Sequence, residues 1–420
     1  MVNSMVISGG RLIDGTGAPA VDNSIITIKE GRIEKVGSSG RIEVAPEVLV
    51  IDASGMTVMP GLIDAHVHLS GPYDPYETNI VLSILKTPPP LIALWAVKNA
   101  NVCMEAGCTT LRDMGVLVSR DSVEMISVRR GMEMGLVDGP RLLVSGLVIQ
   151  TSSHGEMASL GRLTPWVDTA YGVSDGPWEV RKRVRHLVGL DVDFIKVIAS
   201  GWSGEVERNW WPNFTLEELT AICDEAHRYH KRVAAHVASA GTMLDAARAG
   251  CDTLEHLVEI DDQTIETILK RNIILVPTLS LFSERALSRR GRHQKPAVIE
   301  QLRQMTESAI PAFQRCLKAG VRMAMGTDLY RTTMPGENAL EIALLVEHGM
   351  SEMDAIVTAT KNSAEACGLS DQLGTVTPGK WADLLLVAGD PLQDIRILED
   401  KNKIRLVMKG GEIKVDRRLH

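Results

Sequence analysis

The middle of the chain alternates short apolar segments with amphipathic ones, and this alternation limits the fold more than any other feature. Between residues 61 and 370, eight apolar segments have the length and composition of buried strands. They lie at 62–67, 109–113, 141–149, 193–198, 232–237, 252–256, 273–278 and 321–327. Helical patterns lie between them, and eight consecutive strand–helix units predict an α/β fold, a closed (β/α)₈ TIM-like barrel.

Two helices are predicted with defined ends. One runs from Thr215 to Tyr229, where Thr215 and Glu218 have the spacing of a capping box. Another runs from Ala339 to Glu347. The alternative to a barrel is a doubly wound open sheet, which needs a glycine-rich phosphate loop after its first strand. This chain has His66-Val67-His68 there, so the barrel is favoured.

Both ends of the chain have a β pattern. Hairpins are predicted at 24–28 with 32–36 and at 404–408 with 412–415, and further strands at 48–52, 57–59 and 382–387. Neither end is long enough to bury much surface separately. We therefore expect one small β-sandwich domain from residues 1–60 and 371–420, beside a barrel domain of residues 61–370.

Composition excludes several classes of partner. The net charge is −8 and no long block of like charge is present, so we expect no nucleic-acid or membrane partner. No apolar run approaches the ~20 residues of a membrane span, and Met1 to Gly10 lacks a signal-peptide pattern. The six cysteines form no C-x-x-C pair. Reduced thiols in a cytoplasmic protein are the simplest interpretation.

Ligand-type residues stand at the ends of several predicted strands. His66 and His68 are two residues apart on a strand, so their side chains share one face. A lone H-x-H pair is common by chance, but His236, His256 and Asp328 end three other strands. Functional side chains of a barrel gather at these strand ends. Each histidine alone is more simply a hydrogen-bonded core residue, whereas the set predicts a site for a zinc-like ion.

Lys196 lies within an apolar strand, which would bury its ammonium group at high cost. Three explanations compete. Lys196 pairs with a carboxylate, forms a Schiff base with substrate, or reacts with carbon dioxide to give a carbamate that bridges two metal ions. The surrounding histidines favour the carbamate.

These motifs resemble the amidohydrolase superfamily, and within it the Xaa-Pro dipeptidase and imidazolonepropionase-like branch, in the neighbourhood of the ochratoxin amidases. The resemblance covers essentially the whole chain. It rests on five stretches: Asp52 to His68, Phe194 to Val197, Leu254 to His256, Gly326 to Asp328, and Gly374 to Leu384.

The resemblance implies a dinuclear site, usually of zinc. His66, His68 and Asp328 would hold one ion, His236 and His256 the other, with carboxylated Lys196 and a hydroxide as bridges. Asp328 would act as general base and then general acid. The reaction implied is hydrolysis of an amide-type C–N bond in an N-acyl amino acid, a dipeptide, or an aryl amide or carbamate. Family habit also implies a homo-oligomer.

Substrate contacts are expected from three further positions. His154 matches a histidine that contacts substrate in this branch, and we interpret it as a donor to the carbonyl or oxyanion; otherwise it is an exposed loop residue. Ala238 replaces a tyrosine found in many relatives. Trp202 belongs to a loop that also contains Trp210 and Trp211, which forms either an apolar wall or ordinary packing or an oligomer contact.

Two other functions remain open. A mononuclear deaminase or cyclic-amide hydrolase of the same superfamily is the first, although Lys196 argues against it. A non-catalytic binding protein is the second, although such members typically lose ligands that this chain keeps.

Overall fold

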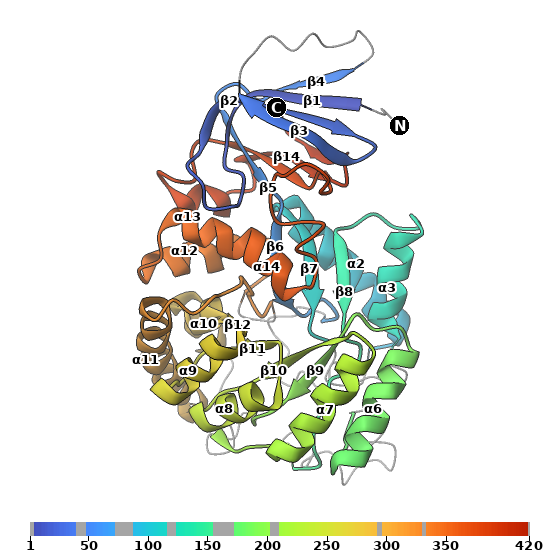
Figure 1. Ribbon diagram of the computed structural model, residues 1–420, viewed down its shortest axis with the longest axis vertical. Coiled ribbons are helices and arrows are strands. Elements are labelled where there is room, and N and C mark those ends of the chain that lie inside the picture. Colours follow the sequence, from blue (N-terminus) through green and yellow to red (C-terminus); the bar gives the residue numbers. More distant parts are fainter. Residues whose placement is uncertain are drawn as a thin grey trace.

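The computed structural model describes residues 4–38, 48–71, 87–115, 123–153, 172–201, 210–291, 296–329 and 333–418, with side chains left out at 289–291, 296–298, 301 and 302. The molecule is elongated. Strands from both termini lie together at one end, and the α/β segment forms the rest (Figure 1).

The two ends of the chain join in one eight-stranded sheet. Its strands are β1 (Ser4–Leu12), β2 (Val21–Lys29), β3 (Arg32–Ser38), β4 (Leu49–Asp52), β5 (Met56–Pro60), β13 (Leu384–Ala388), β14 (Ile404–Lys409) and β15 (Glu412–Asp416). The order is β15-β14-β13-β5-β1-β2-β3, with β4 also paired to β1. Both predicted hairpins are confirmed as antiparallel pairs, and antiparallel pairing of β5 with β13 joins the termini.

The turns of the two hairpins pack against each other. Gly31 has φ +76°, and a Cβ atom there would overlap the carbonyl oxygen of Gly410. Only glycine combines this backbone conformation with so close an approach. Some apolar side chains of the sheet, including Ile7, Ile26 and Leu384, form a core cluster of their own, whereas others, such as Leu385 and Val407, belong to the main core.

The α/β segment contains two parallel sheets. The first consists of β6 (Leu62–Val67), β7 (Cys108–Asp113) and β8 (Arg141–Val144), and the second of β9 (Phe194–Ile198), β10 (Arg232–His236), β11 (Thr253–Glu255) and β12 (Ile274–Val276). Isolated bridges pair Ile149 with Val197, Leu275 with Met323, and Val67 with Leu329. Seven of the eight predicted strands are therefore present, although β8 is shorter than expected.

The eighth predicted strand, 321–327, is not a regular strand. Part of its backbone bonds to its neighbours, since Ala324 N–H donates to Leu275 and the Met325 carbonyl accepts from Ala65. The Met325 N–H, however, bonds to the Ser363 hydroxyl and the Thr358 carbonyl. These bonds to the chain that follows interrupt the ladder.

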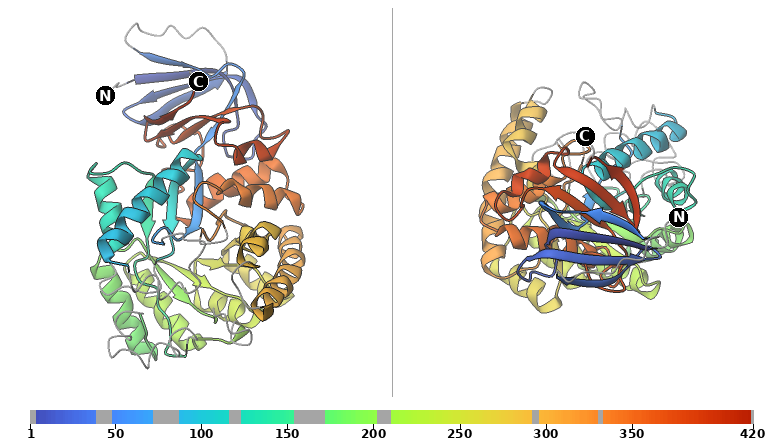
Figure 2. Two further views of the ribbon diagram at one scale, coloured as in Figure 1. Left: turned by 180° about the vertical axis from the view of Figure 1, so that it is seen from behind. Right: turned by 90° about the horizontal axis from the view of Figure 1, so that it is seen from above.

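Helices flank the parallel strands (Figures 1 and 2). They are α2 (Pro89–Glu105), α3 (Glu124–Glu133), α6 (Pro177–Gly189), α7 (Leu216–Arg228), α8 (Ala240–Ala249), α9 (Asp262–Arg271), α10 (Glu284–Gly291), α11 (Pro296–Lys318), α12 (Ala339–Glu347), α13 (Glu352–Val357) and α14 (Ser363–Ala366). A 3₁₀ turn spans Leu279–Phe282, another Ile395–Glu399, and a π-helical turn Thr358–Asn362. The predicted capping box of Thr215 and Glu218 is confirmed at the start of α7.

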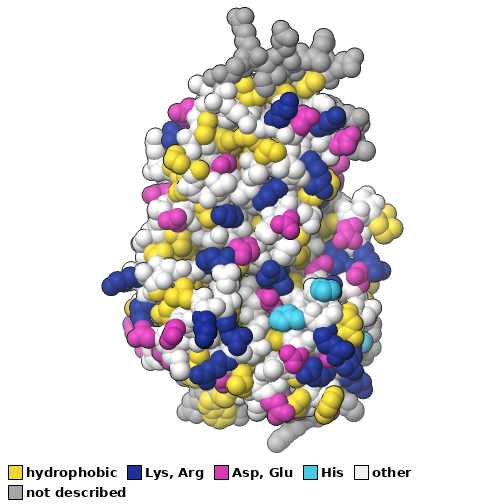
Figure 3. All heavy atoms as spheres, viewed as in Figure 1, with side chains coloured by type: hydrophobic (Ala, Val, Ile, Leu, Met, Phe, Trp, Pro, Cys, Tyr) yellow, Lys and Arg dark blue, Asp and Glu magenta, His cyan; other side chains and the backbone are white. Residues whose placement is uncertain are grey.

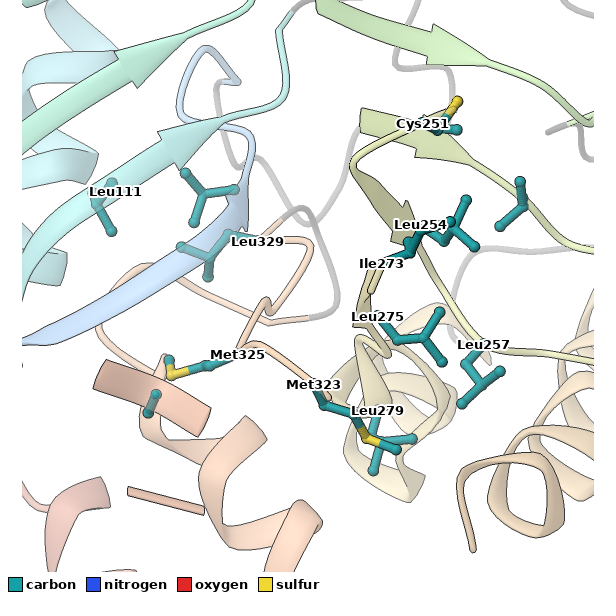
Figure 4. Close-up of a cluster of buried hydrophobic side chains, with 14 of the residues drawn as sticks. Leu111, Cys251, Leu254, Leu257, Ile273, Leu275, Leu279, Met323, Met325 and Leu329 are labelled. Atoms are coloured by element: carbon teal, nitrogen blue, oxygen red, sulfur yellow. The ribbon is translucent and has the colours of Figure 1, made fainter. Parts of the chain in front are cut away.

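The main core lies between these helices and the strands. Figure 4 shows Leu111 of β7, Leu254 of β11 and Leu275 of β12 with Met323 and Leu329 from the segment after α11, and all five side chains are buried. Acidic and basic side chains are interspersed over the viewed face (Figure 3). Within the described ranges, no helix is both long and apolar enough to cross a bilayer.

Candidate metal centre

His66, His68 and Asp328 meet at one point beside the end of β6. The Nε2 atoms of His66 and His68 lie 3.5 Å and 3.3 Å from Oδ1 of Asp328. One possible ligand atom from each residue lies within 4.8 Å of the others. Nitrogen and carboxylate ligands at this spacing suit a zinc-like ion.

Two more histidines lie beside this trio. His236 is the last residue of β10, and His256 directly follows β11. The ring centroids of His236 and His256 are 4.5 Å apart, and those of His66 and His256 are 4.9 Å apart. His256 has φ 73° and Asp328 has φ 51°. Residues other than glycine adopt such positive φ values at a cost, and residues that do so are concentrated at functional sites.

The Nδ1 atoms of three of these histidines are engaged away from the centre. His66 Nδ1 lies 2.8 Å from Glu255, His68 Nδ1 2.8 Å from the Gly115 carbonyl, and His256 Nδ1 2.8 Å from the Thr278 hydroxyl. Nε2 is then the nitrogen left to serve as a ligand. Metal-binding histidines are commonly oriented in this way by a partner on the other ring nitrogen.

Lys196 occupies the middle of β9, opposite Ala234 in β10. Its side chain is among the largest that are fully buried, and Nζ has no hydrogen-bond partner within the described part of the chain. Burial lowers the pKa of Lys196 to about 8, against the opposing influence of Glu255 and Asp328. A buried amine without a partner is costly unless it is modified or neutralised.

Charge around His66 is set by a buried ion pair. Arg112 Nη2 donates to Glu255 Oε1 at 3.0 Å, and both side chains are almost inaccessible. Burial alone would raise the pKa of Glu255, but the charge of Arg112 and the hydrogen bond from His66 lower it to about 2. Burial and the charge of Lys196 lower the pKa of His66 to about 4. A neutral His66 therefore faces an ionised Glu255.

Asp328 is ionised as well. Burial would raise its pKa, but the contact with His68 and the neighbouring imidazoles hold it well below the usual range. The N–H of Asp328 donates to the His66 carbonyl. An ionised carboxylate in this place can bind a cation or accept a proton.

Asp64, in β6, holds the segment that contains Asp328 against that strand. Its carboxylate accepts from the backbone of His66, from the backbone and hydroxyl of Thr327, and from Asn338 Nδ2. The residue before Asp328 is therefore tied to β6, which contains His66 and ends one residue before His68.

Of the three predicted substrate-contact residues, the structure describes only Ala238. His154 and Trp202 lie outside the described residues. Ala238 is buried two residues after His236, and its N–H donates to the Ser200 hydroxyl at 2.8 Å. In the predicted tryptophan loop, Trp210 packs beside the cluster of Val258 and Phe282, whereas Trp211 is 56% exposed.

Sequence reasoning did not single out Arg112, Glu255 or Asp64. A signal was present, because Arg112 and Glu255 are opposite charges within two of the strands predicted to be buried. Two buried charges of opposite sign usually pair. Their position next to His66, however, depends on how three strands align.

Comparison with known proteins identifies the family. The model of the Amidohydrolase family matches residues 57–414. Ochratoxinase of Aspergillus niger is 32% identical over 97% of this chain and 86% of its own length. The crystal structure of an Xaa-Pro dipeptidase with bound methionine has a TM-score of 0.86 at 29% identity, covering 98% of this chain and 99% of its own. The structure of A. niger ochratoxinase has a TM-score of 0.84 at 27% identity, covering 99% and 96%.

These relatives match the predicted branch, and membership of the family implies an α/β fold of the TIM-barrel type, with which the parallel strands agree. The chain belongs to the amidohydrolase family and is a hydrolase.

Proposed function

We propose that the protein is a dinuclear metal-dependent hydrolase that cleaves an amide-type C–N bond in a small molecule. The observation that carries the proposal is the convergence of His66, His68 and Asp328 beside a second histidine pair. The four histidines stand at or just after the C-terminal ends of β6, β10 and β11, where barrel enzymes build their active sites, and Asp328 follows the segment 321–327.

We infer that residues 61–370 form a closed eight-stranded barrel. In support, the isolated bridges at Ile149, Met323 and Leu329 link the two parallel sheets and the segment 321–329 in a ring. We further infer that residues 1–60 and 371–420 form a β-sandwich domain, supported by their shared sheet and by a core cluster drawn from these residues alone.

The residues present fit two divalent ions. His66, His68 and Asp328 would hold one, and His236 and His256 the other. The buried Lys196 amine, for which the described residues offer no hydrogen-bond partner, would carry a carbon-dioxide-derived carbamate between them. Zinc suits this mixture of imidazole and carboxylate ligands. Bound divalent cations would lower the pKa of a water molecule and polarise the scissile carbonyl.

The chain's own residues would handle the proton and the substrate. Asp328, ionised and buried beside His68, would take a proton from the attacking water and deliver it to the leaving nitrogen. We assign His154 a hydrogen bond to the substrate carbonyl, and Trp202 and Ala238 a place along the substrate. These three assignments rest on the family resemblance.

The relatives' names support an amide-type substrate. One relative is an Xaa-Pro dipeptidase and another an ochratoxinase. A dipeptide, an N-acyl amino acid, and an aryl amide or carbamate are the compounds that we propose to test.

Elemental analysis combined with Asp328→Asn tests the proposal. We expect two metal ions per chain, hydrolysis of at least one compound in the panel, and loss of that activity in the variant. Asp262→Asn is the matched control, since Asp262 is 97% exposed and contacts Arg315. Metal-free protein with full activity would contradict the proposal, and one ion per chain would favour the mononuclear alternative.

A further inference from the structure

A buried chain of side chains crosses three strands directly behind His66. Arg112 lies in β7, Glu255 ends β11, and His66 is in β6. His66 Nδ1 donates to Glu255 Oε2 at 2.8 Å, and Arg112 Nη2 donates to Glu255 Oε1 at 3.0 Å. The three side chains are each 1% exposed or less, so solvent competes little for these bonds.

Arg112 is held in one position by its other donors. Nε donates to the Ala65 carbonyl at 2.7 Å, and Nη1 donates to the Ala366 carbonyl at 3.2 Å. The guanidinium group also lies over the ring of Phe194, 5.3 Å from its centroid. A guanidinium fixed at so many points can hold its carboxylate partner in a single orientation.

Glu255 is fixed from its own strand too. The Thr253 hydroxyl donates to Oε1 at 2.5 Å, on the same oxygen that Arg112 contacts. Oε2 is thereby left for His66. A carboxylate in this position accepts only when His66 carries its proton on Nδ1, and that tautomer directs the Nε2 lone pair toward Asp328 and His68.

The contacts of the other site histidines differ in strength. His68 Nδ1 donates to the neutral carbonyl of Gly115, and His256 Nδ1 contacts the neutral hydroxyl of Thr278. A hydrogen bond to an ionised acceptor is roughly twice as strong as one between neutral groups. Of these three Nδ1 contacts, that of His66 is therefore the one to a charged group.

We propose that Glu255 is a positioning residue for the metal centre, that Arg112 anchors it, and that the pair sets metal affinity by fixing the Nδ1–H tautomer of His66. This inference rests on the proposed function, since it requires His66 to be a metal ligand. Neither Glu255 nor Arg112 needs to touch the substrate.

The tautomer can be measured without any metal. Long-range ¹H–¹⁵N spectra of metal-free wild-type protein labelled at histidine, with His66 assigned by a His66→Gln variant, should show a proton on Nδ1 of His66. A wild-type His66 protonated on Nε2 alone overturns the inference, whatever the variants do.

Metal affinity provides the second test. In chelator competition with Zn²⁺, Glu255→Gln should weaken binding by about 10–100-fold, the range expected for loss of such a partner. Glu225→Gln is the matched control, because Glu225 is a 1% exposed glutamate on α7 that holds Arg185 and Arg181. Both variants replace a buried carboxylate that contacts arginine, but only Glu255→Gln should change Zn²⁺ affinity and the His66 tautomer.

The outcomes separate this inference from the proposed function. Wild-type protein that binds no Zn²⁺ overturns both. Wild-type protein that binds Zn²⁺, with Glu255→Gln within twofold of it, overturns the positioning role and leaves the proposed function standing. An equal loss of Zn²⁺ affinity in Glu225→Gln also overturns the positioning role, since it would trace the effect to stability.

Discussion

Asp64 and Thr327 lie 263 residues apart in the chain, yet the Asp64 carboxylate accepts hydrogen bonds from both the N–H and the hydroxyl of Thr327. Asp64 precedes His66 by two residues, and Thr327 directly precedes Asp328. This pair of bonds therefore joins the two segments that carry His66, His68 and Asp328.

Asp64→Asn should weaken that junction. Both carboxylate oxygens accept hydrogen bonds, from four donor groups in total, whereas an asparagine has one oxygen and adds an N–H₂ group that cannot accept. Leaving a buried donor unpaired costs about 1–3 kcal/mol, so the free energy of unfolding in urea should fall by that amount. Asp22→Asn, at a side chain that is 73% exposed, should leave it unchanged. Equal stability of the two variants would count against the junction.

Lys196→Ala should reduce metal binding and activity together. The lysine is buried among the site histidines, and its replacement removes the only amine in β9 that could carry a carbamate. We expect fewer than two ions per chain by elemental analysis. We also expect the Zn²⁺ affinity at one site to fall by more than about 100-fold, a larger loss than that of a residue that only orients a ligand. Full activity with one ion would instead favour a mononuclear enzyme.

Metal removal should lower stability by an amount that depends on the free ion. An ion that binds only the folded state adds about 2.7 kcal/mol at a concentration 100 times its Kd. Titration of chelator-treated protein with Zn²⁺ should therefore raise the free energy of unfolding. His68→Ala should respond less, because one ligand of the trio is missing. The same response in both proteins would mean that Zn²⁺ binds elsewhere.

Glu341 should make stability fall as pH rises. Burial raises the pKa of Glu341 from 4.5 to about 8, although its oxygens accept from the N–H groups of Leu279 and Ser280. The folded state then keeps a proton that the unfolded state loses, so this contribution declines between about pH 4.5 and pH 8 and is constant above that range. The free energy of unfolding should be measured across this range for Glu341→Gln and the wild type. Its slope against pH should be more positive in the variant, by as much as about 1.4 kcal/mol per pH unit. Parallel profiles for the two proteins would contradict the assignment.

Local pattern was sufficient for most elements of the fold. Apolar segments of strand length predicted β6, β9 and β10 to within a residue, and the spacing of Thr215 and Glu218 predicted the start of α7. The family and its branch could also be predicted, because they depend on short motifs such as the one that ends in His66-Val67-His68. Period and spacing are properties of neighbouring residues, so the sequence displays them directly.

The eighth strand shows where local pattern fails. Residues 321–327 are as apolar as the other segments, but the Met325 N–H bonds to Thr358 and Ser363 instead of extending a ladder. Likewise, His256 and Asp328 adopt positive φ values that the adjacent residues in the sequence do not predict. The surrounding tertiary contacts impose both departures.

By itself the sequence determined the order of strands and helices, the family, and the six residues that we assign to the metal centre. The tertiary structure alone decided which side chains support them. Glu255 meets His66 and Arg112 because β6, β7 and β11 bring them together. Asp64 meets Thr327 because the segment 321–329 lies against β6. Strand register brings together residues that are remote in the chain, and no periodicity within one segment encodes that alignment.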